Sequence, residues 1–298
     1  MRSVLAGVIG FVLFVSNASA ESPATCDPEQ IDRESYRLAT EGQALNVLQP
    51  RYRWWDAFNV GKHEWDLADL NETARVLAER ARALDDRNLL AHGLLARSYV
   101  VLGEDAGKAI EAWTRTLDGG GAVTWTATLY DVDAYSFFVV AFDRTALRIY
   151  RFGALAGVFE KQMKGIPVFP AATNERFWRA MGGCIDSSAA FEAEIPWSDV
   201  EEIKSGNWVI WIKFRTPARI ASDRGKSRAV RELKMNLHGQ TGDLTFHYNV
   251  GRYGEAQNLR GIAVGPTDYQ RRVQHVLATM FDSSRRIKLP QKGRGAGW

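Results

Sequence analysis

The hydrophobic and polar positions of this chain follow two different periods. From about residue 28 to 118, apolar residues recur every three or four positions, which is typical of a helix with one buried face. From 122 to about 250, apolar and polar residues alternate, which is typical of strands. Asp118 and the glycines 119–121 lie between these regions and predict a helix end followed by a short joint. We therefore expect an α+β protein with a helical domain, residues 28–118, before a β domain, residues 122–285.

Six or seven antiparallel strands and a closing helix are expected in the β domain. The strand from Val123 to Leu129 places four apolar side chains on one face and three threonines on the other, a half-buried pattern. Apolar residues at three- and four-residue steps between Tyr269 and Phe281 predict an amphipathic helix. This helix would close an antiparallel barrel or sandwich. Further strands are expected at 135–142, 146–152, 189–195, 207–215, 228–238 and 243–250.

Small residues recur at helical spacing in the first domain. Ala74, Ala78, Ala81 and then Asp86 resemble the second helix of a tetratricopeptide repeat (TPR). The resemblance covers about residues 55 to 118 and implies a TPR-like array of α-hairpins, which would hold a protein or peptide partner. The next unit resembles the motif more completely, with matches at Leu95, Ala96, Tyr99, Gly103, Ala109, Trp113 and Leu117.

Three tryptophans of the helical domain are candidate binding residues. Trp54 and Trp55 are adjacent, and neighbouring side chains on a helix point in different directions, so one of them can face a groove. Trp65 fits the aromatic position of the first, less complete repeat. The alternative is an ordinary α-hairpin domain without a ligand groove. Both interpretations remain open at this point.

The β domain resembles a pleckstrin-homology (PH) or GRAM-type domain in the order of its strands and closing helix. The segment from Ile195 to Ile203, before the strand of Trp208, is part of this resemblance. Trp208 and Trp211 lie on opposite faces of that strand, so both cannot enter one interior. Trp211 either packs under the closing helix or the helical domain, or it offers a stacking surface for a ligand. The ligand would be a lipid or a glycan in the mouth of a barrel.

The first 20 residues have the features of a secretory signal peptide. Arg2 precedes an apolar run from Val4 to Val15, and the small residues 18–20 would allow cleavage after Ala20. A membrane-spanning helix needs about 20 apolar residues, so an uncleaved anchor is the minor alternative. We expect a periplasmic or secreted protein.

Two cysteines remain after removal of this segment, Cys26 and Cys184. Because an isolated pair in an oxidising compartment usually bridges, we expect a disulfide between them. The alternative is that Cys184, which follows two glycines, is a catalytic nucleophile. No base in its local sequence supports that alternative.

The formal charge of the chain is close to neutral, at +3. This balance argues against nucleic acid as a partner, since such proteins generally carry a strong basic field. A basic segment rich in glycine, residues 286–298, is expected to be a flexible tail. The alternative is peripheral contact of this tail with anionic lipid or a cell-wall polymer.

Signatures of catalysis and of cofactors are missing from the sequence. No phosphate-binding loop, dinucleotide motif or nucleophile elbow is present, and His238 and His247 are too far apart on their expected hairpin for one metal ion. The carboxylate pairs Glu201-Glu202 and Glu192 with Glu194 fit a turn and an exposed strand face. We expect no metal, no cofactor and no enzymatic activity. A hydrolase that uses Cys184 or an acid pair is the least favoured alternative.

Together these patterns predict an exported interaction or assembly protein of the cell envelope, whose TPR-like helices bind a protein or peptide. A lipid- or glycan-binding β domain is the second hypothesis.

Overall fold

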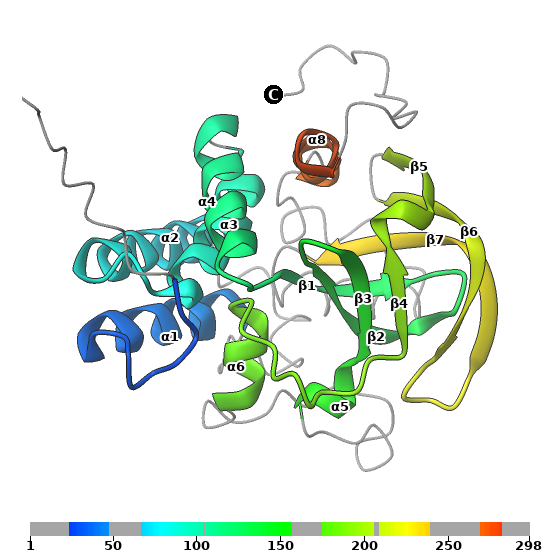
Figure 1. The fold of residues 1–298 in the computed structure, drawn as a ribbon, viewed down its shortest axis with the longest axis horizontal. Coiled ribbons are helices and arrows are strands. Elements are labelled where there is room, and N and C mark those ends of the chain that lie inside the picture. The colour runs from blue at the N-terminus through cyan, green and yellow to red at the C-terminus, as the bar shows by residue number, and fades with distance from the viewer. Residues whose placement is uncertain are drawn as a thin grey trace, which may run out of the picture.

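The computed structural model describes residues 24–47, 67–103, 105–156, 175–205, 209–238 and 269–281. The predicted signal peptide, Trp54, Trp55 and Trp65, the expected strand at 243–250 and the basic tail lie outside these residues. The first four helices are α1 (Arg33–Val47), α2 (Leu67–Leu84), α3 (Leu89–Leu102) and α4 (Ala106–Asp118). They gather on one side of a β-barrel (Figure 1).

Within the described residues, seven antiparallel strands form one sheet in the order β4-β3-β2-β1-β7-β6-β5. A short 3-10 turn, Trp197–Asp199, joins the edge strands β4 and β5, and β4 also lies against β6. The sheet therefore curls into a nearly closed barrel (Figure 1). The strands are β1 (Val123–Leu129), β2 (Asp133–Phe142), β3 (Ala146–Arg151), β4 (Ala193–Pro196), β5 (Val200–Ser205), β6 (Ile210–Ala221) and β7 (Ser227–His238).

Alternating apolar residues of the strands fill the barrel interior. Trp125 of β1 contacts Phe142 of β2 and Trp113 of α4, with ring centroids 5.9 and 5.6 Å apart. At one end, α8 (Tyr269–Phe281) lies over the barrel, where Phe281 stacks on Trp197 at 4.2 Å. The closing helix was expected from its apolar spacing, and its bounds agree with the prediction.

The strand β1 is buried on both faces, whereas its alternation predicted a half-buried strand. Its threonine face lies under α6 (Glu175–Met181), a helix the sequence did not reveal. Thr124 Oγ1 donates to the carbonyl oxygens of Met181 (2.7 Å) and Ala180 (3.1 Å). The Thr124 hydroxyl thus satisfies the last carbonyls of that helix, which lack partners inside it.

Two inserted helices cover the outer face of β2 and β3. They are α5 (Phe152–Ala156) and α6, which lie between β3 and β4 in the chain. Phe152 and Phe177 of these helices pack edge to face, with centroids 5.4 Å apart, in a second apolar cluster against Phe137 and Val139 of β2. One part of the outer sheet face is therefore closed by helices.

The predicted TPR-like array of α-hairpins before a separate barrel or sandwich is wrong as a description of this fold. In a repeat array each unit contacts only its neighbours. Here α3 contacts α1, α2, α4, α6, α8 and β1, and all thirteen residues from Leu89 to Val101 are buried. Tyr99 and Trp113, two of the residues that match the repeat motif, belong to the same apolar cluster as the barrel interior.

Local signals nevertheless set the ends of α3 and α4. Asn88 Oδ1 accepts the backbone N–H groups of Leu90 and Ala91, which caps the start of α3. Gly103 ends the helix with φ 74°, a left-handed conformation that favours glycine. Asp105 caps α4 through the N–H of Gly107. The α3–α4 hairpin thus forms where the sequence predicted two helices.

Candidate functional site

The outer face of β5, β6 and β7 carries a hollow centred on Trp211. Every residue that lines it belongs to one of these three strands, whereas helices pack on the outer face of β2 and β3. We call this feature the Trp211 hollow. It has a volume of about 200 Å³ and is lined by Glu202, Lys204, Trp211, Lys213, Glu232 and Lys234.

Strand register places these residues in two rows across the sheet. Lys204, Trp211 and Lys234 stand side by side on β5, β6 and β7. The row continues to Tyr130, which follows β1, is 37% exposed and donates its backbone N–H to the Lys234 carbonyl oxygen at 3.0 Å. Since neighbouring strands lie about 4.8 Å apart, the backbones of Trp211 and Tyr130 are roughly 10 Å apart. Two aromatic residues therefore flank one lysine.

The second row consists of Glu202, Lys213 and Glu232, so opposite charges alternate along it. Further ion pairs balance the lysines: Lys204 lies 2.6 Å from Glu202, and Lys213 lies 3.5 Å from Glu201. Lys234 approaches Asp131 at 3.6 Å. The hollow thus combines an aromatic ring with closely mixed donors and acceptors and little net charge.

The indole N–H of Trp211 is buried and has no hydrogen-bond partner within the described part of the chain. Two interpretations of Trp211 were open: packing under the closing helix or the helical domain, or a ligand-stacking surface. The ring lies on the face of β6 opposite Ile210 and Ile212, in a hollow lined by strand residues alone. The residue keeps partial exposure. A partly exposed indole ring in a hollow is a suitable contact for an amphipathic ligand.

Positive charge is concentrated in the hairpin of β6 and β7, which we call the basic ribbon (Ile210–His238). It contains eight lysines and arginines against two acidic residues, a net charge of +6 in a chain of +3. Figure 1 shows it as a long curved hairpin on the side of the barrel away from α1 and α2. The near-neutral total concealed this feature, and a charge count per predicted hairpin would have found it.

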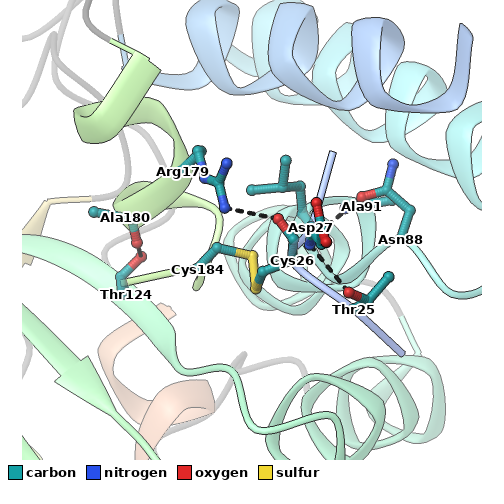
Figure 2. The surroundings of a disulfide bond; sticks show 10 residues. Thr25, Cys26, Asp27, Asn88, Ala91, Thr124, Arg179, Ala180 and Cys184 are labelled. Carbon is teal, nitrogen blue, oxygen red and sulfur yellow. Dashed lines mark hydrogen bonds between the residues drawn. A yellow bond between two sulfur atoms is a disulfide. The ribbon is translucent and has the colours of Figure 1, made fainter. Parts of the chain in front are cut away.

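Cys26 and Cys184 form a disulfide in the structure, with an S–S distance of 2.02 Å. Figure 2 shows the bond beside Arg179 of α6, whose guanidinium donates to the Cys26 carbonyl oxygen at 2.8 Å. Because the bonded sulfur is not a thiolate, this arrangement does not support Cys184 as a nucleophile.

The acidic pairs considered for hydrolysis face cations. Glu192 pairs with Arg151 at 2.6 Å and Glu194 with Arg148 at 2.8 Å. Glu201 and Glu202 lie in strand β5, not in the turn that the sequence suggested. Among the described residues, no cluster of three histidine, cysteine or acidic side chains could hold a metal ion.

The structure offers no test of the other predicted binding residues, Trp54, Trp55 and Trp65, which lie outside the described residues. The sequence predicts a ligand site in the barrel mouth. In the structure, core side chains that include Phe142 and Trp197 fill the barrel interior under α8. Among the described helices, none has both the length and the apolar character needed to cross a bilayer.

The chain matches no protein-family model, no curated protein and no solved structure. The comparisons therefore assign it to no family, and its resemblance to PH or GRAM-type domains stays a prediction.

Proposed function

We propose that this protein is an exported, non-enzymatic carbohydrate-binding protein that holds a glycan chain on the outer face of β5, β6 and β7. The observation that supports this proposal is the Trp211 hollow, whose lining residues all come from the strands β5, β6 and β7. The proposal develops the second of the two sequence-based hypotheses. It moves the ligand from the barrel mouth to the outer sheet face.

Sugar rings suit this hollow for two chemical reasons. Their C–H faces are apolar and can stack on the indole of Trp211, while their hydroxyls both donate and accept hydrogen bonds. Lys204 and Lys234 offer donors beside the ring, and Glu202 and Glu232 offer acceptors. A mixed set of donors and acceptors fits hydroxyls better than it fits a lipid tail.

The size of the hollow favours a chain over a small enclosed ligand. Enclosed sites for small molecules usually measure about 300–1,000 Å³. The Trp211 hollow, at about 200 Å³, is smaller. A polymer compensates for shallow contact at each unit by engaging several units, and Tyr130 extends the aromatic surface along the same row.

Export is supported by the N-terminal sequence and the disulfide. A bond between Cys26 and Cys184 is in keeping with an oxidising compartment, where disulfides persist. In this proposal the helices α1 to α4 stabilise the barrel from one side. They leave the opposite side, with the basic ribbon, free to meet a ligand (Figure 1).

Substitution of Trp211 by alanine tests the proposal. The purified mature protein is applied to an array of neutral and acidic oligosaccharides, and the affinity for the best-bound glycan is then measured by calorimetry. We expect Trp211→Ala to weaken this binding about tenfold, which corresponds to about 1.4 kcal/mol of lost stacking. Because the ring lies on the outer face, the melting temperature should change by no more than about 2 °C.

Phe191→Ala is the matched control, because Phe191 is an exposed aromatic residue, at 48%, outside the hollow. It should bind the glycan as the wild type does. If the wild type binds no glycan on the array, or if Trp211→Ala binds as tightly as the wild type, the proposal is wrong.

A further inference from the structure

The charges of the Trp211 hollow and of the rest of the basic ribbon are arranged differently. In the hollow, Lys204, Lys213 and Lys234 each lie within 4 Å of a carboxylate oxygen. Farther along the ribbon, Arg215, Arg219 and Arg231 are exposed and form no ion pair with any described residue. The unpaired positive charge is therefore displaced from the aromatic centre.

Arg215 lies on the same face of β6 as Trp211. Residues 211, 213 and 215 alternate with Ile210, Ile212 and Phe214, which point into the barrel. At about 3.3 Å per residue, the Arg215 backbone is roughly 13 Å from that of Trp211. A glycan of several sugar units that stacks on Trp211 and runs along β6 therefore passes Arg215.

Arg219 continues this direction beyond an irregularity in the pairing of β6 with β7. The register shifts between Lys213 and Ala218, and regular pairing resumes with Arg219 opposite Ala229. Arg231 of β7 lies between the two paired segments. Arg215 and Arg231 thus lie within this irregular segment of the ribbon, and Arg219 lies just after it on β6.

Arginine is suited to bind the carboxylates of an acidic polymer. Its planar guanidinium presents a fork of N–H donors that matches a carboxylate, and it stays charged at neutral pH. Arg215 and Arg219 are exposed on the same strand, and a polyanion that contacts both would neutralise their charge. An uncharged glycan would not.

We propose that the glycan is an acidic polysaccharide that stacks on Trp211 and runs along β6, so that its carboxylates bind Arg215 and Arg219. This inference rests on the proposed function and adds the charge and the direction of the ligand. Selectivity for the acidic polymer then comes from the arginines, and ring stacking comes from the tryptophan.

Two forms of one polymer separate these roles. Polygalacturonate fragments of about ten units carry one carboxylate per sugar, and their methyl esters keep the same backbone without the charge. We expect the wild type to bind the acid form at least tenfold more tightly than the ester, with an affinity that falls as salt rises. The double variant Arg215→Gln/Arg219→Gln should lose about tenfold for the acid form and bind the ester unchanged.

The matched control is Arg37→Gln/Arg80→Gln, which removes the same charge from exposed positions of α1 and α2. It should keep the wild-type preference for the acid form. Trp211→Ala should weaken binding of both forms equally, because the stacked ring is common to them. This pattern would support both the stacking role and the arginine role.

Several results would overturn the inference. The inference fails if the wild type binds neither form, if it binds acid and ester equally, or if the Arg215/Arg219 variant binds the acid form as tightly as the wild type. If the wild type binds single-stranded DNA of equal length more tightly than the acid form, nucleic acid is the preferred polyanion and the inference also fails. If Trp211→Ala weakens binding but the Arg215/Arg219 variant does not, this inference fails and the proposed function stands. If Trp211→Ala weakens binding of neither form, the proposed function itself fails.

Discussion

Arg97 lies buried where the helices meet the barrel, and its contacts join four elements. Its guanidinium donates to the carbonyl oxygens of Met181 (2.9 Å) and Thr124 (3.3 Å) and to Oε1 of Gln43 (2.6 Å). Burial lowers the pKa of Arg97 to about 9, which leaves the group charged at neutral pH. A charge held by carbonyl dipoles thus links α1, α3, α6 and β1.

His92 provides a prediction at this scale, because it is buried in α3 and its Nε2 lies 2.8 Å from the Asp86 carbonyl oxygen. Burial lowers the pKa of His92 below its ordinary value of 6.5, since the charged form loses hydration. The unfolded chain therefore binds a proton more readily than the folded protein. The folded protein, in which His92 is neutral, therefore keeps its full stability above about pH 6.5. It loses stability as the pH falls below that value, because the unfolded chain gains a proton at this histidine.

Urea unfolding between pH 5 and 8 measures this effect. One proton accounts for a slope of at most about 1.4 kcal/mol per pH unit. The difference in free energy of unfolding between wild type and His92→Gln should be constant above pH 6.5 and should shrink below it. A difference that stays constant over the whole range would contradict the assignment to His92.

At the scale of elements, the backbones of α3, the end of α6 and the start of β1 lie in close contact, and glycines at the contact points make this possible. A Cβ atom on Gly93 of α3 would lie 2.2 Å from the Gly182 carbonyl oxygen, and one on Gly183 would lie 2.1 Å from the Ala122 carbonyl oxygen. Gly183 also has φ 90°, a conformation that other residues avoid. The disulfide of Cys184 follows directly after this close contact.

Gly93→Ala should destabilise the protein although alanine is the better helix former. The helix preference of alanine contributes about 1 kcal/mol at most, whereas the added methyl group meets a backbone oxygen that cannot rotate away. We expect a net loss of about 1–3 kcal/mol in urea unfolding. Gly107→Ala, on the exposed first turn of α4, is the control and should stay within about 1 kcal/mol of the wild type. Equal effects of the two substitutions would contradict the close contact.

At the scale of the whole molecule, the disulfide ties the start of the described chain to the segment between α6 and β4. Cys26 and Cys184 are 158 residues apart. The loop that the bond closes is therefore long, and a long loop restricts the unfolded chain strongly. Arg272 of α8 adds a second long-range link, because it donates to the carbonyl oxygens of Val100 (2.6 Å) and Val101 (2.8 Å) at the end of α3.

Cys26→Ala should lower the free energy of unfolding by about 2–5 kcal/mol, and Cys184→Ala should have a similar effect. The double variant should lose little more than either single variant, since each removes the same bond. Thermal unfolding with and without a reductant measures these losses. Additive losses, or a wild type whose stability does not respond to complete reduction, would contradict a stabilising bond.

Much of the β domain was predictable because period-two alternation depends only on neighbouring residues. The strand at 123–129 agrees with the prediction, and that at 228–238 begins one residue earlier in the structure. The prediction failed where tertiary contacts decide the structure. The sequence predicts a turn at Glu201 and Glu202, where the structure has strand β5, because the two charged residues mask the apolar Val200 and Ile203, which pack inside the barrel.

The candidate site was predictable only in part. The sequence placed Trp211 on the strand face opposite Ile210 and Ile212, but it could not say what covered that face. Whether an outward side chain is buried depends on elements distant in the chain: α5 and α6 pack on the outer face of β2 and β3, whereas only strand residues line the hollow around Trp211. The lysines that line the hollow come from three strands and meet only through the sheet register.

The sequence by itself determined the local structure: the periods of the helices and strands, the ends of α3 and α4, and the two faces of β6. These depend on residues within a few positions of one another. The tertiary structure decided that the helices share a core with a nearly closed barrel, where a repeat array was expected. It also decided that Trp211 is the centre of a hollow among balanced charges. Both outcomes depend on contacts between distant segments, which local periodicity does not encode.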